Sequence, residues 1–440
     1  MHAPSFPSRT WVPIDADLSL TKNLTPLLQH LETRLDAISS ASTLEEWLAS
    51  ADELFAAIDE CRTRRYIAMT CQTDDPEKEK HYLHFVEVVD PWLKPRRFAL
   101  TQKLVLLESF QSLPPYHAVF RRSLLNEIDI YREANIPRET ELARLSQSYQ
   151  KTIGSMTAPF EGQEQTLPRL AKILEEPDRS RRQACWEAVT LRRLQDAETF
   201  ESLFDQMLSL RKSVALEAGS PDYRHYIFRA RERFDYTPDH CLQFHATIET
   251  TFCPLVKELQ QTRSRQLGLT PLRPWDLAVD PENHPPLKPF ATSSELLSKC
   301  EAIFTKIDPR LGSMAALLRE KNLVDLDNRK GKAPGGYQAT LEEARLPFIF
   351  MNVVGTQRDV ETLLHEGGHA FHALASREQK LYAYRNSPIE FCEVASMSME
   401  LLAGEFLTEF QLKIIRRLRM LSMTWSRRIS WWEMKSLIRR

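Results

Sequence analysis

Residues 347–376 read PFIFMNVVGTQRDVETLLHEGGHAFHALAS and join a strand pattern to a helix pattern. The first eight residues are apolar, short in run and bounded by turn signals, which predicts a strand over 347–354. Thr356 can then cap a helix, with Asp359 three residues later. The apolar residues of that helix recur at helical spacing and predict one buried face: Val360, Leu363, Leu364, Phe371 and Leu374. We therefore expect a strand that leads directly into an amphipathic helix.

Two histidines of this segment, His365 and His369, are four residues apart. On a helix their rings project from the same side about one turn apart, so they can share a tetrahedral zinc ion. Glu366 lies beside the first histidine but is rotated from it, and in the H-E-x-x-H pattern such a glutamate acts on the nucleophilic water instead of binding the metal. With 12 histidines in the chain, chance gives roughly 0.03 occurrences of this pattern. The sequence therefore favours a metal site over a helix whose histidines merely pack.

A closed zinc site needs a third protein ligand, and the sequence places it on a second helix. A third histidine six residues after the second is excluded, because Ala375 stands there. SPIE at residues 387–390 predicts a helix start, with a serine N-cap, a proline at the first position and a capping-box glutamate. Glu393 and Glu400 lie seven residues apart on that helix, hence on one face. We predict Glu393 as the third ligand and Glu400 as the group that orients a histidine from behind.

Three further residues near the motif each leave two interpretations open. Glu361, one turn before His365, either accepts the second ring proton of that histidine or is a solvated helix residue. Glu390 fits a capping role better than a ligand role. His372 shares the ligand face but lies beyond the pair, so it either packs or contacts the substrate.

The composition of the 440 residues is that of a globular protein, with 42% hydrophobic and 27% charged residues, which excludes disordered, collagen-like and coiled-coil classes. A net charge of -2 gives no basic field for nucleic acid. None of the 12 glycines precedes Gly154. Because glycine costs about 1 kcal/mol in a helix interior, the N-terminal part is expected to be helical. Thr43-x-x-Glu46 is predicted to open one helix, and Thr292-x-x-Glu295 a later one.

The seven cysteines are odd in number and widely spaced, with no C-x-x-C pair. This usage is typical of reduced thiols in a cytosolic protein. The first 20 residues contain prolines and lack the apolar core of a signal peptide. No stretch approaches the roughly 18 apolar residues that a membrane span requires. We therefore expect a cytoplasmic protein without a membrane span.

Four motifs follow one another in the second half of the chain: GKAPGGY (331–337), PFIFMN (347–352), HEGGHAFH (365–372) and IEFCEVASMSMELL (389–402). In this order and spacing they resemble oligoendopeptidase F and its relatives in the M3, thimet-oligopeptidase-like, zinc metallopeptidases, over at least residues 200–410. The resemblance implies a mainly α, two-lobed zincin fold of the gluzincin type, with a small β element beside the HExxH helix. Position by position, it gives His365, His369 and Glu393 as ligands of one Zn2+ and Glu366 as the general base.

The resemblance also implies hydrolysis of peptide bonds in short oligopeptides that enter a deep channel. The strand at 347–354 is suited to pair with an extended substrate through its main chain. The glycines at 330–337 would form a mobile loop close to the substrate backbone. The residues expected to contact substrate are Gly335, Gly336, Tyr337, Phe350 and Asn352. Nothing in the sequence indicates an oligomeric state.

The sequence departs from the family after the third ligand. The family supplies a histidine and tyrosines there that stabilise the oxyanion, but this sequence has no histidine after His372 and no tyrosine after Tyr384. Losing one oxyanion donor costs about 10²–10³ in rate. We therefore expect a chain that is shortened at its C-terminus and impaired in turnover. The alternative is a non-catalytic zinc-binding remnant that binds peptides or serves as a scaffold.

We expect three regions: an N-terminal helical region at 1–195, an incomplete catalytic region at 196–410 and an atypical basic tail at 411–440. The tail holds nine Lys/Arg and one acidic residue, which gives it a charge of +8. Either a frameshift begins near Gln411, or the tail is a genuine basic amphipathic helix that binds a partner or an anionic surface.

Overall fold

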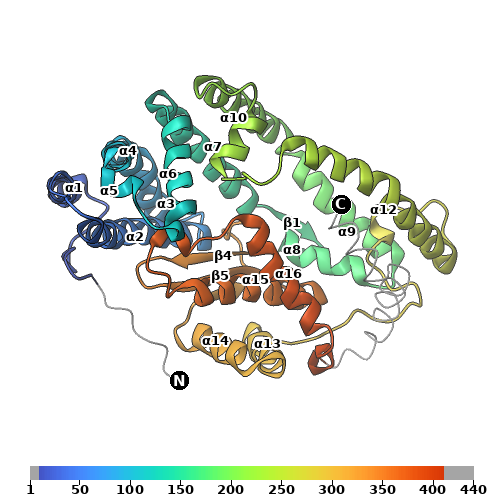
Figure 1. Ribbon diagram of the computed structural model, residues 1–440. Coiled ribbons are helices and arrows are strands. Elements are labelled where there is room, and N and C mark those ends of the chain that lie inside the picture. Colours follow the sequence, from blue (N-terminus) through green and yellow to red (C-terminus); the bar gives the residue numbers. More distant parts are fainter. Residues whose placement is uncertain (1–8, 411–440) are drawn as a thin grey trace.

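The computed structural model describes residues 9–410 (Figure 1). The chain is mainly helical with two small sheets, which confirms the predicted fold class. Within the described range, every helix is too short or too polar to span a lipid bilayer. The tail at 411–440, with the frameshift predicted near Gln411, lies outside the described residues.

Seven α-helices form the described N-terminal part, at the blue end of the chain in Figure 1. They are α1 (Thr21–Asp36), α2 (Ala41–Cys71), α3 (Pro76–His84), α4 (Asp90–Leu106), α5 (Glu108–Gln111), α6 (Ala118–Ile130) and α7 (Ile136–Gly154). Apolar residues of α1, α2 and α4 to α6 share one core, and Leu381, far along the chain, packs into it. The scarcity of glycine therefore correctly predicted helices here.

The start of α2 differs from the prediction. Its N-cap is Ser40, whose Oγ accepts a hydrogen bond from the Thr43 N–H at 3.3 Å. In return, Thr43 Oγ1 accepts one from the Ser40 N–H at 3.1 Å. Thr43 is therefore the third helical residue of a capping box, and Ser40 is the N-cap. The helix begins three residues earlier than predicted, because the Ser40 side chain accepts from a free N–H of the first turn.

The middle of the chain adds a hairpin and five helices. These elements are β1 (Thr157–Phe160), β2 (Gln163–Thr166), α8 (Leu167–Ala171), α9 (Arg179–Leu194), α10 (Ala197–Glu217), α11 (Tyr223–Ala230) and α12 (Pro238–Leu267). In Figure 1, α10 and α12 lie along the upper side of the molecule. The boundary predicted after residue 195 falls between α9 and α10.

The last part of the described chain contains the predicted metal helices and a three-stranded sheet. Its elements are α13 (Ser293–Ile307), α14 (Pro309–Glu320), β3 (Val324–Asp327), β4 (Tyr337–Leu341), β5 (Leu346–Val353), α15 (Gln357–Ser376) and α16 (Ile389–Ala403). Thr292 caps α13 as predicted, because its side chain accepts from the Glu295 N–H at 3.1 Å. The apolar face of α15 packs with α13, α14 and one face of the sheet in a second core.

The strand predicted at 347–354 is the central strand of this sheet. The order is β3-β5-β4, with β5 parallel to β3 and antiparallel to β4. Both edges of β5 are therefore occupied, and the prediction that this strand pairs with an extended substrate is wrong. Strand β4, the antiparallel neighbour of β5, lies at an edge of the sheet.

Candidate metal centre

Helix α15 starts with a firmly bonded cap that fixes its direction out of β5. Thr356 and Asp359 form the predicted capping box. Asp359 Oδ2 accepts from the N–H groups of Val354, Gly355 and Thr356 at 3.0, 2.8 and 2.7 Å. Because the strand leads into the helix without a free loop, the histidines two turns later have a fixed position relative to the sheet.

Two glycines inside the motif let the neighbouring helices approach α15. A side-chain carbon added at Gly368 would lie 2.5 Å from Ser396 Cα on α16. One added at Gly367 would lie 2.7 Å from the Phe304 ring on α13. The glycines are therefore required by close packing on two sides, and this packing brings α16 within reach of the histidines.

The second metal helix begins differently from the prediction. The N-cap of α16 is Pro388, without a side-chain cap, and Ser387 Oγ instead lies 3.1 Å from His372 Nε2. Glu390 does not close a capping box either. Its carboxylate pairs with Arg233 Nε at 2.9 Å and accepts a hydrogen bond from Tyr236. Ser387 therefore contacts His372, while Arg233 and Tyr236 from a distant part of the chain contact Glu390, so neither side chain caps α16. His372 thus has a hydrogen-bond partner within the protein.

The three predicted ligands come together. One donor atom each of His365, His369 and Glu393 lie within 4.8 Å of one another, and no other such trio of His, Cys, Asp or Glu occurs within residues 9–410. Glu393 Oε2 is 3.4 Å from His365 Nε2, and Glu393 Oε1 is 3.8 Å from His369 Nε2. Burial lowers the pKa of His369, which favours the neutral imidazole that binds metals.

Glu400 and Glu361, both predicted behind the ligands, have different surroundings. Glu400 Oε1 lies 2.7 Å from His365 Nδ1. Glu361 instead accepts from Gln357 Nε2 at 3.1 Å and pairs with Arg358 at 3.3 Å. Glu400 and Glu393 face the two ring nitrogens of His365. Glu361 contacts other residues, so it does not accept the ring proton of that histidine.

Glu366 is a buried carboxyl with an unused oxygen. The residue is 6% exposed, and its Oε2 has no hydrogen-bond partner among the described residues. Burial raises its pKa to about 7, and the nearby Glu393 charge adds to the effect, whereas His365 and the Gln338 N–H oppose it. An orphaned carboxylate oxygen beside two imidazoles and a second carboxylate fits a bound divalent cation with its water, so the residues present are suited to zinc.

The residues predicted to contact substrate divide into two groups. Phe350 is 0% exposed and stacks on Tyr337 with ring centres 4.7 Å apart. Asn352 Nδ2 donates to main-chain oxygens of the glycine loop, one of them Gly335 O at 2.9 Å. The side chains of Phe350 and Asn352 therefore have internal partners, and Phe350 has no exposed surface to offer a substrate. Gly335 has open space around its Cα, and a carbon added at Gly336 would lie 3.5 Å from Glu366 Oε1.

One residue beside Glu366 escaped the sequence analysis. Gln338, on β4, directs its backbone N–H to the Glu366 carboxyl. A backbone donor carries no side-chain signal, so only the position of β4 at the sheet edge could have indicated it. Together with Gly336, whose added carbon would lie 3.5 Å from Glu366 Oε1, this N–H indicates that β4 begins beside the candidate general base.

A family model described as Peptidase family M3 matches residues 172–415, more than half of the chain. The chain belongs to peptidase family M3. The match in this M3 peptidase chain begins upstream of the catalytic boundary predicted at residue 196. The histidine pair and Glu393 all lie within the matched residues.

Curated relatives of this M3 chain are similar over limited segments. An oligoendopeptidase F homolog of Lactococcus lactis is 29% identical over 154 residues, which cover 35% of this chain and 25% of the relative. The oligopeptidase PepF of Bacillus subtilis is 38% identical over 88 residues, covering 20% of this chain and 13% of the relative. The aligned segments thus span a quarter or less of these relatives.

Solved structures show the same fold over nearly the whole chain. A Bacillus anthracis protein assigned as an oligoendopeptidase F superposes with a TM-score of 0.87 at 21% identity, covering 96% of this chain and 76% of that protein. PZ peptidase A, solved with an inhibitor, gives a TM-score of 0.87 at 24% identity, covering 94% and 72%. At these identities the likeness shows the fold.

Proposed function

We propose that this M3 peptidase chain is a zinc-dependent endopeptidase for short oligopeptides, with one Zn2+ held by His365, His369 and Glu393. One observation carries the proposal. The three donor atoms converge within 4.8 Å beside a buried Glu366 oxygen that has no partner among the described residues. A convergent set of metal donors with an unused carboxylate is the arrangement that metal-assisted hydrolysis requires.

Each side chain of the centre then has a task. When bound, zinc lowers the pKa of a water and polarises the scissile carbonyl. Glu366 accepts the proton of the attacking water and passes it to the departing amine. Glu400 holds the Nδ1 side of His365, 2.7 Å away, so that Nε2 remains free for the metal.

The edge of β4 is the surface we assign to the substrate backbone, in place of β5. In an antiparallel pair, alternate residues direct their N–H and C=O groups away from the partner strand. The Gln338 N–H donates to the Glu366 carboxyl, and Ile349, which opposes Gln338 on β5, directs its own N–H to Leu323 O on the other side. Thr340, two residues on and opposite Pro347, shares this orientation. An extended peptide that adds to this edge would be held through its main chain, which gives little side-chain selectivity.

Turnover by a polypeptide of these 440 residues is expected to be low. The family resemblance assigns oxyanion stabilisation to a histidine and tyrosines, and the sequence has no histidine after His372 and no tyrosine after Tyr384. The second candidate function is therefore peptide binding without cleavage, on the same zinc site.

All seven cysteines are free thiols, which supports a cytoplasmic location.

The test measures zinc per chain together with cleavage of a quenched fluorogenic peptide. We expect one zinc per chain and slow internal cleavage. Glu366→Gln should keep the zinc and lower kcat by about 10²–10⁴, whereas Glu378→Gln, an exposed residue just after α15, should change neither. Peptide binding without cleavage, equal in the full chain and in Glu366→Gln, would establish the second candidate instead. A chain that binds no zinc would refute both.

A further inference from the structure

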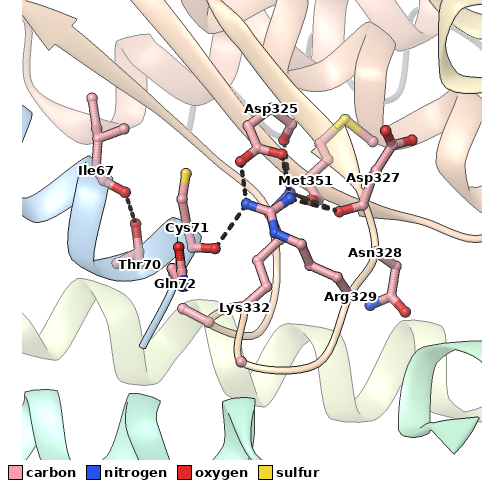
Figure 2. A network of polar contacts seen from close by, with 12 residues as sticks. Ile67, Thr70, Cys71, Gln72, Asp325, Asp327, Asn328, Arg329, Lys332 and Met351 are labelled. Atoms are coloured by element: carbon pink, nitrogen blue, oxygen red, sulfur yellow. Dashed lines mark hydrogen bonds and ion pairs between the residues drawn. The ribbon is translucent and has the colours of Figure 1, made fainter. Parts of the chain in front are cut away.

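A lysine lies at the centre of a second polar cluster beside β5. The Lys332 side chain is 0% exposed, and its Nζ donates to Asp325 Oδ1 at 2.8 Å and to Asp325 O at 3.0 Å. It also donates to the main-chain oxygens of Asp327 at 3.0 Å and Met351 at 2.5 Å (Figure 2). The same nitrogen lies 4.4 Å from the centre of the Phe350 ring. All three donors of the ammonium are therefore used inside the protein.

An irregularity in the sheet explains why these main-chain oxygens are available. Asp325 and Asp327 on β3 face Phe350 and Val353 on β5, so the register between the strands shifts at this point. Such a bulge leaves main-chain groups without their ladder partners, and a buried carbonyl without a donor is costly. The Lys332 ammonium supplies the donors that the ladder lacks.

Arg329 binds the same carboxylate from the solvent side. Its two terminal nitrogens lie 2.8 and 2.6 Å from the Asp325 oxygens, and its side chain is 42% exposed. Burial raises the pKa of Asp325, but hydrogen bonds from Arg329, Cys71 and Lys332 outweigh it and hold that pKa well below its usual range. Asp325 therefore keeps one cationic partner when the other is removed, which makes Arg329 a matched control for Lys332.

Lys332 belongs to the glycine loop that the sequence predicted to be mobile, and the structure bonds this loop to α2. The Gly331 carbonyl accepts from Thr73 N–H at 2.5 Å and from Thr73 Oγ1 at 2.8 Å. The Ala333 N–H donates to Thr70 O at 2.8 Å. The loop is thus held between the C-terminal end of α2 and the Lys332 cluster.

The far end of the loop meets the metal centre. Asn352 Nδ2 on β5 donates to Gly335 O at 2.9 Å. A carbon added at Gly336 would lie 3.3 Å from Phe350 O and 3.5 Å from Glu366 Oε1. The loop therefore passes close to the Glu366 carboxylate immediately before it becomes β4.

We propose that Lys332 is a positioning residue for peptide hydrolysis: its buried ammonium fixes the glycine loop and the first residues of β4 against Glu366. The inference rests on the proposed function, because it deepens the role of the same site. No contact joins Lys332 to the three metal ligands, so it acts through the loop and the edge strand. A misplacement of about 1 Å at a catalytic group can cost about 10²-fold in rate.

The first test compares Lys332→Met with Arg329→Met in the full chain. Methionine keeps an unbranched side chain of similar length but has no donor. We measure amide hydrogen exchange at 333–341 by mass spectrometry, zinc per chain, the melting temperature, and kcat and KM for a fluorogenic peptide. Lys332→Met should speed exchange at 333–341 by about tenfold or more, and lower kcat by about 10- to 100-fold at nearly unchanged KM with zinc retained. Arg329→Met should leave exchange at 333–341, zinc content and kcat close to those of the unmodified chain.

A second variant displaces the same loop without touching the lysine. A carbon added at Gly154, the last residue of α7, would lie 2.8 Å from Lys332 O and 2.9 Å from Thr73 Oγ1. Gly154→Ala should therefore speed exchange at 333–341 and lower kcat several-fold, with zinc retained, and it decides the question if Lys332→Met does not fold.

Two results would overturn the inference. One is unmodified exchange at 333–341 in a folded Lys332→Met or Gly154→Ala chain. The other is a lowered melting temperature with unchanged kcat per zinc-loaded molecule, which is the signature of a purely structural role. If the unmodified chain itself shows no turnover, the proposed function fails, and the exchange measurement still decides whether Lys332 positions the loop.

Discussion

Two polar clusters of this chain differ in how completely their groups are paired. In the first, the Lys332 ammonium meets four oxygens and Asp325 meets two cations. In the second, both histidine rings face the single carboxylate of Glu393. Glu366 Oε2, also in the second cluster, has no partner among the described residues.

The difference separates a structural cluster from a site that needs a ligand. A closed network holds the chain in place, because every buried charge is compensated by another part of the protein. In the open network, Glu393 has only the two histidines as ion-pair partners among the described residues, and Glu366 Oε2 has no hydrogen-bond partner there. A divalent metal supplies the missing positive charge, and the predictions below test that interpretation.

The largest effect is expected when the open cluster loses a ligand. Glu393→Gln removes the carboxylate that faces both histidines, and zinc affinity should fall by more than about 100-fold, because even outer partners of ligands account for about 10–100-fold. Competition with a chromophoric chelator measures the affinity. The control is Glu390→Gln on the same helix, whose carboxylate pairs with Arg233. Equal losses in both variants would contradict a metal role for Glu393.

A smaller loss of zinc affinity is expected when a residue that contacts a ligand, but not the metal, is changed. Glu400→Gln weakens the hydrogen bond to His365 Nδ1 and should lower zinc affinity by about 10- to 100-fold. Glu361→Gln should lower it much less, since that carboxylate contacts Gln357 and Arg358. The same chelator competition distinguishes the two, and a larger effect at Glu361 would reverse their order.

Sequence patterns were sufficient where the required information is local. The spacing of His365 and His369 and the apolar face of α15 depend on a single helical period, and the cap by Thr356 depends on its neighbours. The existence of the helix that carries Glu393 also follows from its own residues, although the predicted serine cap does not form. All three predicted ligands therefore converge in the structure.

The remaining features depend on partners that are distant in the sequence. The central place of β5 requires both β3 and β4, and the α16 start differs because Arg233 and Tyr236 claim Glu390. From the sequence alone, a lysine in a glycine-rich loop is expected to be exposed to solvent. Only the bulge between β3 and β5 makes Lys332 a buried donor.

The third prediction opens the metal centre mechanically while leaving the Lys332 cluster untouched. A carbon added at Gly368 would meet Ser396 Cα at 2.5 Å and Ala395 O at 2.6 Å, and backbone atoms cannot rotate away. Gly368→Ala should therefore lower the free energy of unfolding by about 2–3 kcal/mol and weaken zinc binding. Chemical denaturation and chelator competition measure the two effects.

Gly367→Ala is the comparison for that variant. Its added carbon would meet the Phe304 ring at 2.7 Å, and a side chain can shift where a backbone cannot. We expect a smaller loss of stability and nearly normal zinc binding. If Gly368→Ala also speeds hydrogen exchange at 333–341, the metal centre and the glycine loop are mechanically coupled, as the role proposed for Lys332 requires.

The smallest effect concerns a third buried carboxyl, Glu342. It tests whether every buried carboxylate oxygen without a hydrogen-bond partner marks a metal or ligand site. Its Oε2 also lacks a partner among the described residues, while its Oε1 accepts from Asn386 at 3.2 Å. Burial raises the pKa of Glu342 from 4.5 to about 7, and the charges of Asp59 and Glu60 add to this whereas Arg385 opposes it. No histidine or cysteine joins this group in a metal trio within residues 9–410.

For Glu342 we therefore expect a pH-dependent stability and no ligand. Between pH 4.5 and about 7 the unfolded chain has lost the proton that the folded chain still holds, so the free energy of unfolding falls as pH rises through this window. Glu342→Gln removes that loss. The difference in the free energy of unfolding between the variant and the unmodified chain should therefore grow in favour of the variant from pH 5 to pH 8, by on the order of 2 kcal/mol. Urea unfolding at both pH values measures the gain, with the exposed Glu45→Gln as control. A gain that is the same at pH 5 and pH 8 would show that Glu342 is ionised in the folded protein throughout, and that its second oxygen has found a partner.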